Sequence, residues 1–107
     1  MLVDSHCHLN FKAYKDDLSE VIGRCHQADM KLINVGAAFD TSLKAVELTS
    51  EKNFYASIGL HPIHVFDEEF DVAKYQELIN NNQKIIAIGE TGFDYWHMTP
   101  QEGKAKK

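Results

Sequence analysis

The spacing of apolar residues changes along the chain between two patterns, and each pattern predicts a different kind of element. Four short apolar runs have the length of buried strands, at residues 1–9, 31–37, 54–60 and 85–89. Between these runs, apolar positions recur every three or four residues, which is the period of a helix with one buried face. This period predicts three helices, at residues 14–29, 40–51 and 68–82.

The order of the predicted elements indicates an α/β fold. Strands that alternate with helices form right-handed crossovers, and such crossovers build a parallel sheet. Four strands and three helices fit either a small open sheet or half of an eight-stranded barrel. Polar residues favour the barrel, because barrel enzymes collect their chemistry at the carboxyl ends of strands. Four such residues end the predicted strands: His6, His8, His61 and Glu90.

The composition is that of one globular domain. The chain has 107 residues, of which 44% are hydrophobic, enough to supply a core. It has no apolar run near the length of a membrane span and no signal sequence at its start, so we expect a cytoplasmic protein without a membrane partner. Cys7 and Cys25 are too few for a disulfide framework, and we expect both to be reduced.

The charge argues against a basic surface that binds duplex DNA. The formal net charge is −5, and without residues 101–107 eight basic groups face fifteen acidic groups. A substrate that carries phosphate would therefore need a bound cation to offset its charge.

Asp4, His6 and His8 are spaced by two, so on a strand all three side chains would point to one face and Ser5 and Cys7 to the other. Two imidazoles about 7 Å apart on one face can converge on one divalent ion. The alternative is a pair of solvated histidines at a strand end. The position on the first strand, after Asp4, favours a metal site. Cys7 is expected to pack behind the strand.

Glu90 ends the fourth predicted strand between Gly89 and Gly92. A carboxylate has two oxygens and can bridge two cations, so Glu90 would suit a binuclear centre if it faced the histidine pair. The flanking glycines allow close approach of backbone or ligand. The alternative is a turn with a solvent-exposed glutamate.

Three motifs together resemble a known family: residues 4–9 (DSHCHL), 59–62 (GLHP) and 89–95 (GETGFDY). Their content, order and spacing resemble the successive N-terminal signatures of the TatD family of metal-dependent deoxyribonucleases, which belong to the amidohydrolase-like barrels. The resemblance extends from Leu2 to about Glu102. It implies a (β/α) TIM-type barrel, of which this chain carries about the first four strands and three helices.

The resemblance also implies roles for residues that match the motifs. His6 and His8 would bind one metal, and Glu90 would bridge it to a second and serve as the catalytic carboxylate. His61 would bind a substrate phosphate. Asp4 and Asp94 would support the ligands without binding metal. The cofactors would be two divalent ions (Zn, Mg or Mn), and the reaction would be hydrolysis of a DNA phosphodiester by a metal-activated water.

The chain departs from the family in several places. Thr91 and Phe93 are less common choices in the glutamate motif, and His26 and His64 match no motif and are expected at the surface. The family's later ligands, two histidines and an aspartate on strands five, six and eight, have no counterpart in a chain far shorter than the roughly 250 residues of a complete barrel. Residues 1–102 are expected to be the barrel part, and residues 103–107 a basic tail of a truncated or frame-shifted product.

The missing half leaves two main functional hypotheses. The chain is either a TatD-like nuclease, in whole or in part, or a non-catalytic half-barrel module that binds one metal ion. A third hypothesis, another amidohydrolase-like barrel acting on a small molecule, is disfavoured by the motif around Glu90. Because a half-barrel exposes the edges of its first and fourth strands, we also expect self-association.

Overall fold

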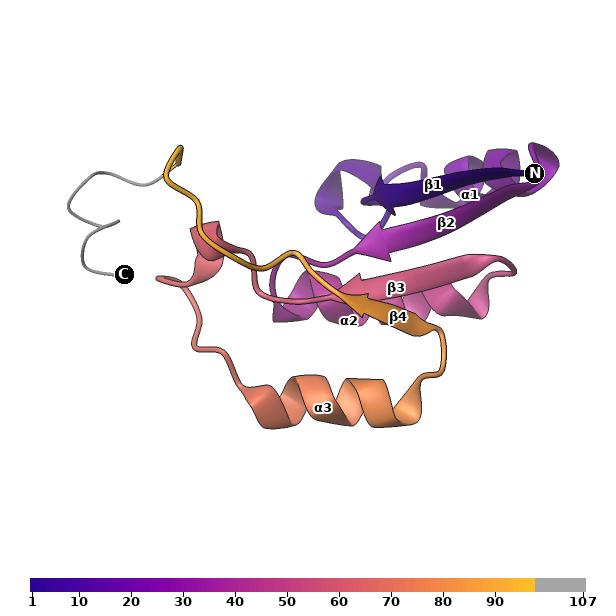
Figure 1. Ribbon diagram of the computed structural model, residues 1–107. Coiled ribbons are helices and arrows are strands. Elements are labelled where there is room, and N and C mark those ends of the chain that lie inside the picture. The colour runs from indigo at the N-terminus through magenta and orange to yellow at the C-terminus, as the bar shows by residue number, and fades with distance from the viewer. Residues whose placement is uncertain (98–107) are drawn as a thin grey trace.

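A four-stranded parallel sheet forms the centre of the computed structural model, which describes residues 1–97 (Figure 1). The strands follow the chain in the order β1-β2-β3-β4, so neighbouring strands are also consecutive in sequence. Their bounds are Leu2–Cys7 (β1), Met30–Val35 (β2), Phe54–Ile58 (β3) and Ile85–Ile88 (β4). The predicted α/β fold is confirmed, and the arrangement is that of the first part of a (β/α) barrel. The predicted tail at 103–107 lies outside the described residues.

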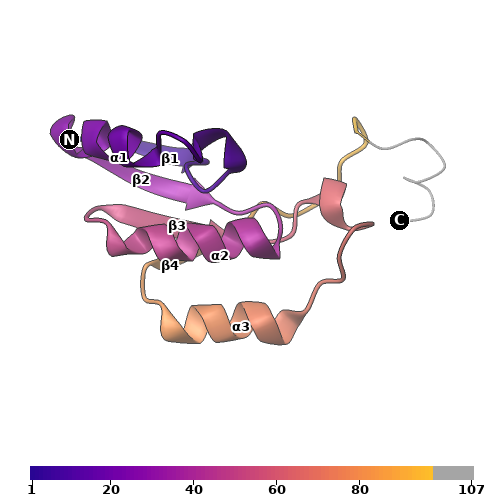
Figure 2. The ribbon, with the colours of Figure 1, turned by 180° about the vertical axis from the view of Figure 1, so that it is seen from behind.

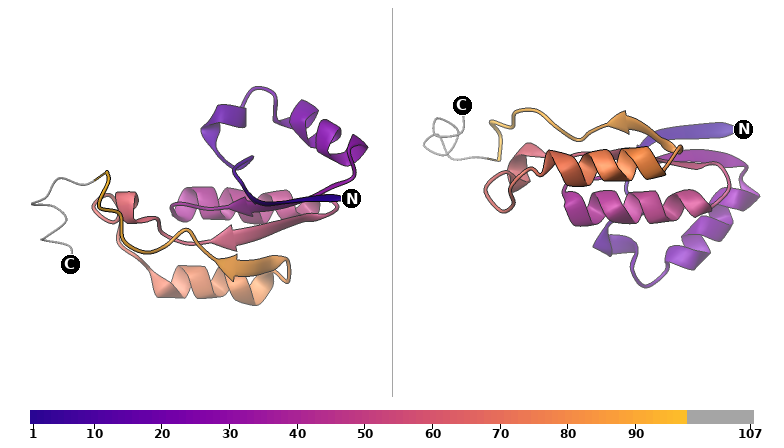
Figure 3. Two further views of the ribbon diagram at one scale, coloured as in Figure 1. Left: turned by 45° about the horizontal axis from the view of Figure 1, so that its top comes forward. Right: turned by 90° about the horizontal axis from the view of Figure 1, so that it is seen from below.

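Three α-helices connect the strands: α1 (Leu18–Gln27), α2 (Phe39–Glu47) and α3 (Val72–Asn81). Short 3-10 helices lie at Lys12–Tyr14, Leu48–Ser50 and Pro62–His64. Viewed from behind, α1 and α2 lie in front of the sheet, and α3 runs beside them below β4 (Figure 2). In two further views, α2 lies between α1 and α3 (Figure 3). Within residues 1–97, no helix is long and apolar enough to cross a membrane.

The core lies between the sheet and the helices. One cluster joins Leu9 and Leu48 to the strand residues Leu32 and Phe54, and α1 packs against it. A second cluster joins α2 and Tyr75 of α3 to Ala56 and Ile58 of β3. Every second residue of the central strands therefore points toward the helices, as the period of a strand requires.

Two helices begin later than the apolar pattern predicts. The helices expected from residues 14 and 68 begin at Leu18 and Val72 instead. The Asp71 carboxylate accepts hydrogen bonds from the backbone N–H groups of Ala73 and Lys74, so it caps α3. Glu68, just outside α3, accepts a hydrogen bond from Phe39 N–H at the start of α2 (3.0 Å). Asp71 thus serves as the cap of α3 rather than as part of its first turn, whereas Asp17 before α1 makes no side-chain capping hydrogen bond.

The register of β1 corrects one expectation about its faces. Asp4 pairs with Leu32 and Cys7 pairs with Asn34, so a bulge separates Asp4 from Cys7. Leu32 packs in the core under the helices, and Cys7 packs against the same cluster. The bulge therefore breaks the strict alternation that placed Asp4 on the face of His6 and His8. Ser5, expected on the opposite face, lines the same pocket as His6.

Candidate metal centre

Backbone hydrogen bonds hold together the segments that follow β2, β3 and β4. Glu90 N–H donates to Gly36 O (2.9 Å), and His61 N–H donates to Ala37 O (2.7 Å), so the segments after β3 and β4 are tied to the segment after β2. A side chain at Gly59 would collide with the backbone of Gly89 and Glu90. The close approach of these two segments therefore requires glycine at position 59 and carries Glu90 toward β1.

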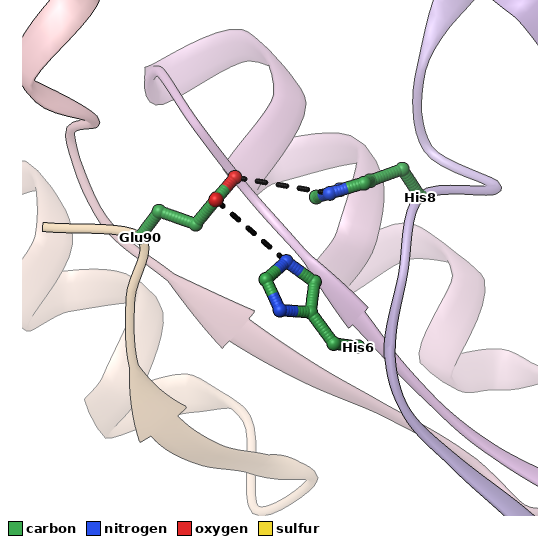
Figure 4. Close-up of side chains that lie close together, drawn as sticks. All are labelled: His6, His8 and Glu90. Carbon is green, nitrogen blue, oxygen red and sulfur yellow. Dashed lines mark ion pairs between the residues drawn. The ribbon is translucent and has the colours of Figure 1, made fainter. Parts of the chain in front are cut away.

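His6, His8 and Glu90 converge at this end of the sheet (Figure 4). The Nε2 atom of His6 lies 3.7 Å from Oε1 of Glu90, and Nε2 of His8 lies 3.8 Å from Oε2. The two imidazoles approach the carboxylate from different directions, with their ring planes at 76°. Sequence spacing predicted that the three residues would meet, and the structure brings them together.

His8 is held with one particular nitrogen facing the carboxylate. Its Nδ1 lies 2.8 Å from the carbonyl oxygen of Val35, which only accepts hydrogen bonds, so Nδ1 carries the proton. The lone pair of a neutral His8 is therefore on Nε2, the atom that faces Glu90. A backbone carbonyl bound to the far nitrogen is the usual support of a metal-binding histidine. Phe11 stacks on the ring at 4.1 Å and restricts it further.

His61 lies in the same cluster but has the opposite proton arrangement. Its Nδ1 accepts a hydrogen bond from the backbone N–H of Ile63 (3.1 Å), which places the proton of a neutral imidazole on Nε2. That Nε2 lies 4.0 Å from Oε1 of Glu90. His61 thus presents a hydrogen-bond donor to the site, whereas His8 presents a lone pair.

The geometry fits one divalent ion. Ligand atoms of His6, His8 and Glu90 all lie within 4.8 Å of one another. Nitrogen and oxygen atoms that bind one ion at about 2 Å lie roughly 3 to 4 Å apart, close to the separations seen here. Within residues 1–97 this is the one group of three such ligands, and residues 98–107 do not enter that comparison.

Asn34 supports the site from behind, although none of the three sequence motifs includes it. Its side chain is fully buried, and its Oδ1 accepts hydrogen bonds from Leu9 N–H (2.9 Å) and from the Cys7 thiol (3.4 Å). These contacts fix the chain on both sides of His8. A signal was present, because an asparagine inside an otherwise apolar strand needs buried partners. Its Oδ1 has them, whereas its Nδ2 has no hydrogen-bond partner among residues 1–97.

Cys7 packs behind the strand, as expected, and does not face the ligands. Its Sγ donates to the carbonyl of Ile33 (3.4 Å), and burial raises the pKa of the thiol to about 12, with a smaller contribution from the charge of Asp4. At neutral pH the thiol is protonated, and a protonated thiol is not a metal ligand. Cys7 and Cys25 are both free.

The two aspartates that the motifs single out lie beside the ligands rather than among them. Oδ1 of Asp4 accepts a hydrogen bond from His6 N–H (3.1 Å), so Asp4 contacts the backbone of a ligand residue. Asp94 accepts hydrogen bonds from Trp96 N–H, His97 N–H and Nδ1 of His97, the last at 2.6 Å. The hydrogen bonds from His97 lower the pKa of the Asp94 carboxyl below its ordinary value.

The remaining histidines that match no motif lie at the surface, away from the ligands. His26 Nε2 is 3.0 Å from Oε1 of Glu51, a residue that precedes β3 and so lies at the opposite end of the sheet. His64 faces Asp67 at 3.4 Å. A histidine beside a carboxylate is therefore not rare in this chain, and what distinguishes the candidate centre is that three imidazoles, those of His6, His8 and His61, face one carboxylate.

Comparison with known proteins decides the family. A family model described as TatD related DNase matches residues 3–107. The chain belongs to this family. Among TatD relatives, an uncharacterized metal-dependent hydrolase of Methanocaldococcus jannaschii is 39% identical over 93 residues, which are 86% of this chain and 37% of that protein.

Two further relatives in the TatD family come from bacteria. The uncharacterized metal-dependent hydrolase YabD of Bacillus subtilis is 41% identical over 106 residues, 95% of this chain and 41% of that protein. The uncharacterized metal-dependent hydrolase YcfH of Escherichia coli is 32% identical over 105 residues, 94% of this chain and 38% of that protein. The chain thus spans about two fifths of the length of these curated relatives.

Proposed function

We propose that the chain carries the first half of the active site of a metal-dependent hydrolase that cleaves DNA phosphodiester bonds. The observation that supports this most is the convergence of His6, His8 and Glu90 at the carboxyl ends of the strands, in a member of the TatD family. Relatives named as metal-dependent hydrolases support the hydrolytic reaction. The family model, described as a DNase, supports DNA as the substrate.

Each residue has a distinct part in this proposal. His6, His8 and Glu90 would hold the cation, and the carboxylate of Glu90 would be shared with a second cation. Divalent ions such as Zn, Mg or Mn lower the pKa of water and polarise a phosphoryl oxygen. His61 donates from Nε2 to a phosphate oxygen, because its Nδ1 already accepts a hydrogen bond. Asp4 holds the backbone of His6.

A second candidate function is a module that binds one ion without turnover. It is favoured by the ligand group itself, since residues 1–97 bring together three ligands and no second group of three. A two-metal hydrolase needs both cations to activate water and to offset charge in the transition state. With Glu90 as its one ligand here, a second ion would be held poorly.

An extended chain separates the two candidates. Joining the whole chain to the part of the Bacillus subtilis relative that follows the matched region is expected to give release of nucleotides from the 3′ end of a labelled strand with Mg or Mn. The 107-residue chain alone is expected to show negligible release. Changing Glu90→Ala in the extended chain is expected to reduce the rate at least about 100-fold, the scale of lost transition-state stabilisation.

Glu51→Ala is the matched control for this assay, since Glu51 also faces a histidine but lies at the other end of the sheet. Its rate is expected to stay unchanged. Robust release by the short chain that disappears on Glu90→Ala would contradict the one-ion limit. An extended chain that keeps its activity after Glu90→Ala would contradict the catalytic role of that residue.

The open edges of the sheet support self-association as a further part of the proposal. Within residues 1–97, each of β1 and β4 has a neighbouring strand on one side alone. Apolar side chains near these edges are exposed, namely Leu2, Val3, Ile86 and Ile88. Unpaired strand edges are templates for pairing with another chain. Sedimentation of the 107-residue chain is expected to show a mass that rises with concentration. A monomer throughout the micromolar range would contradict this expectation.

A further inference from the structure

The chain makes a turn directly after His8, and this turn carries a buried polar side chain, that of Asn10. The backbone N–H of Phe11 donates to the carbonyl of His8 (3.1 Å), which closes the turn over residues 8–11. Phe11 also stacks on the His8 ring, which points toward Glu90 (Figure 4). Asn10 is only 6% exposed. A buried amide must be hydrogen-bonded to offset its lost hydration, so its partners show what it does.

Both amide hydrogens of Asn10 are used on backbone carbonyls. Its Nδ2 donates to Val35 O (3.0 Å) and to Thr41 O (2.8 Å). Carbonyl oxygens only accept hydrogen bonds, so these two partners fix which end of the amide faces them. The other end, Oδ1, has no hydrogen-bond partner among residues 1–97. Within these residues, the side chain of Asn10 therefore acts through its donor group.

The carbonyl of Val35 connects Asn10 to the candidate metal centre. Nδ1 of His8 lies 2.8 Å from the same oxygen. A carbonyl oxygen has two lone pairs and can accept from both groups at once. Asn10 and His8 thus meet at one atom at the end of β2, and the far nitrogen of the His8 ring lies 3.8 Å from Glu90.

The second partner of Asn10 belongs to a firmly held turn. Oγ1 of Thr41 accepts hydrogen bonds from the N–H groups of Ala37 and Ala38, both at 2.9 Å, and so closes the connection between β2 and α2. Thr41 O is therefore a fixed point in the first turn of α2. Because Asn10 donates to this oxygen and to Val35 O, it holds the Val35 carbonyl at a set distance from α2.

We infer that Asn10 is a positioning residue for His8. It holds Val35 O where that oxygen accepts from Nδ1 of His8, which keeps the proton on Nδ1 and leaves the lone pair on Nε2 facing the site. The consequence for metal binding rests on the function proposed above, whereas the hydrogen-bond arrangement does not. Loss of a group that supports a metal ligand costs 10- to 100-fold in affinity. Since Asn10 acts through a carbonyl, its loss is expected to cost about tenfold.

The proton position on His8 can be measured without any metal. Long-range ¹⁵N–¹H correlation spectra of the metal-free 107-residue chain, at about pH 8 where an ordinary histidine is neutral, report which ring nitrogen carries the proton. The unchanged chain is expected to show His8 protonated on Nδ1 alone. Asn10→Ala, which removes both donors, and Asn10→Asp, which keeps the shape but removes the amide, are each expected to show a mixture of the two tautomers.

Asn82→Ala is the matched control. Asn82 also donates from Nδ2 to a backbone carbonyl, that of Leu78 (2.9 Å), but it follows α3 at the opposite end of the sheet. Its loss removes the same kind of hydrogen bond without touching Val35 O. The His8 spectrum and the uptake of Mn²⁺ or Zn²⁺ are expected to equal those of the unchanged chain, so a general loss of stability is distinguished from a change at His8.

A measurement on the unchanged chain tests the inference even if the variants of Asn10 do not fold. Both Nδ2 hydrogens of Asn10 are expected to exchange slowly with solvent, because both are donated inside the protein. Rapid exchange of either hydrogen would overturn the inference. A single Nδ1 tautomer of His8 in a folded Asn10→Ala variant would also overturn it, as would unchanged metal uptake by that variant. Absence of metal uptake by the unchanged chain, with His8 still protonated on Nδ1, would remove the proposed function and leave the role of Asn10 intact.

Discussion

The His6→Ala, His8→Ala double variant is expected to take up a divalent ion at least about 100-fold more weakly than the unchanged chain. Removal of residues that only support metal ligands costs 10- to 100-fold in affinity, and this variant removes two ligands themselves. Glu90 would remain as the last member of the group. Calorimetry with Zn²⁺ or Mn²⁺ measures the loss directly, and the unchanged chain is expected to bind more weakly than a complete two-metal site.

His26→Ala provides the control for this measurement. His26 also has its Nε2 beside a glutamate oxygen, at 3.0 Å, but this pair with Glu51 lies at the other end of the sheet. Its replacement is expected to leave metal uptake unchanged. Equal uptake by the unchanged chain and the double variant would exclude the site at His6 and His8.

Asn34→Ala is expected to lower the free energy of unfolding by about 2–4 kcal/mol. The substitution leaves the N–H of Leu9, a buried residue, without its acceptor, and an unsatisfied buried donor costs about 1–3 kcal/mol. It also opens a small cavity at a position that is fully buried. Because Asn34 fixes the residues on both sides of His8, metal affinity is expected to fall together with stability.

Urea denaturation of the metal-free chain measures this effect. Asn80→Ala is the matched control, since Asn80 is exposed on α3 and its side chain accepts a hydrogen bond from the exposed Gln76. Surface changes of this kind usually stay within about 0.5 kcal/mol. A loss below about 1 kcal/mol for Asn34→Ala would show that Asn34 does not support the chain around His8.

The sequence predicted the fold well where apolar spacing alone decides it. The strands within residues 31–37 and 54–60 follow from continuous apolar runs, which buried parallel strands require. Local hydrogen bonds set the features that the spacing of apolar residues did not predict. α3 begins at Val72 because the Asp71 carboxylate caps the backbone N–H groups of Ala73 and Lys74. The spacing of apolar residues carries no information about that contact. The bulge in β1 likewise moves Asp4 off the face of the histidines, and the alternation of apolar and polar residues in the sequence does not indicate this bulge.

For the site, the motifs identified the residues but not their arrangement. The meeting of His6, His8 and Glu90 follows from parallel strands whose carboxyl ends share one edge. The proton positions on His8 and His61 do not follow, because they depend on Val35 O and Ile63 N–H, which belong to other parts of the backbone or to the following turn.

The strand order has a consequence for how the chain acquires its structure during synthesis. Each strand pairs with the one that precedes it in the chain, so the sheet can grow by one strand and one helix at a time as the ribosome releases them. The metal ligands do not share this property, because His6 comes from the first strand and Glu90 follows the last. A nascent chain shorter than about 90 residues would form part of the sheet but would lack Glu90, so the three ligands would not yet be together. Metal binding would therefore follow the formation of β4.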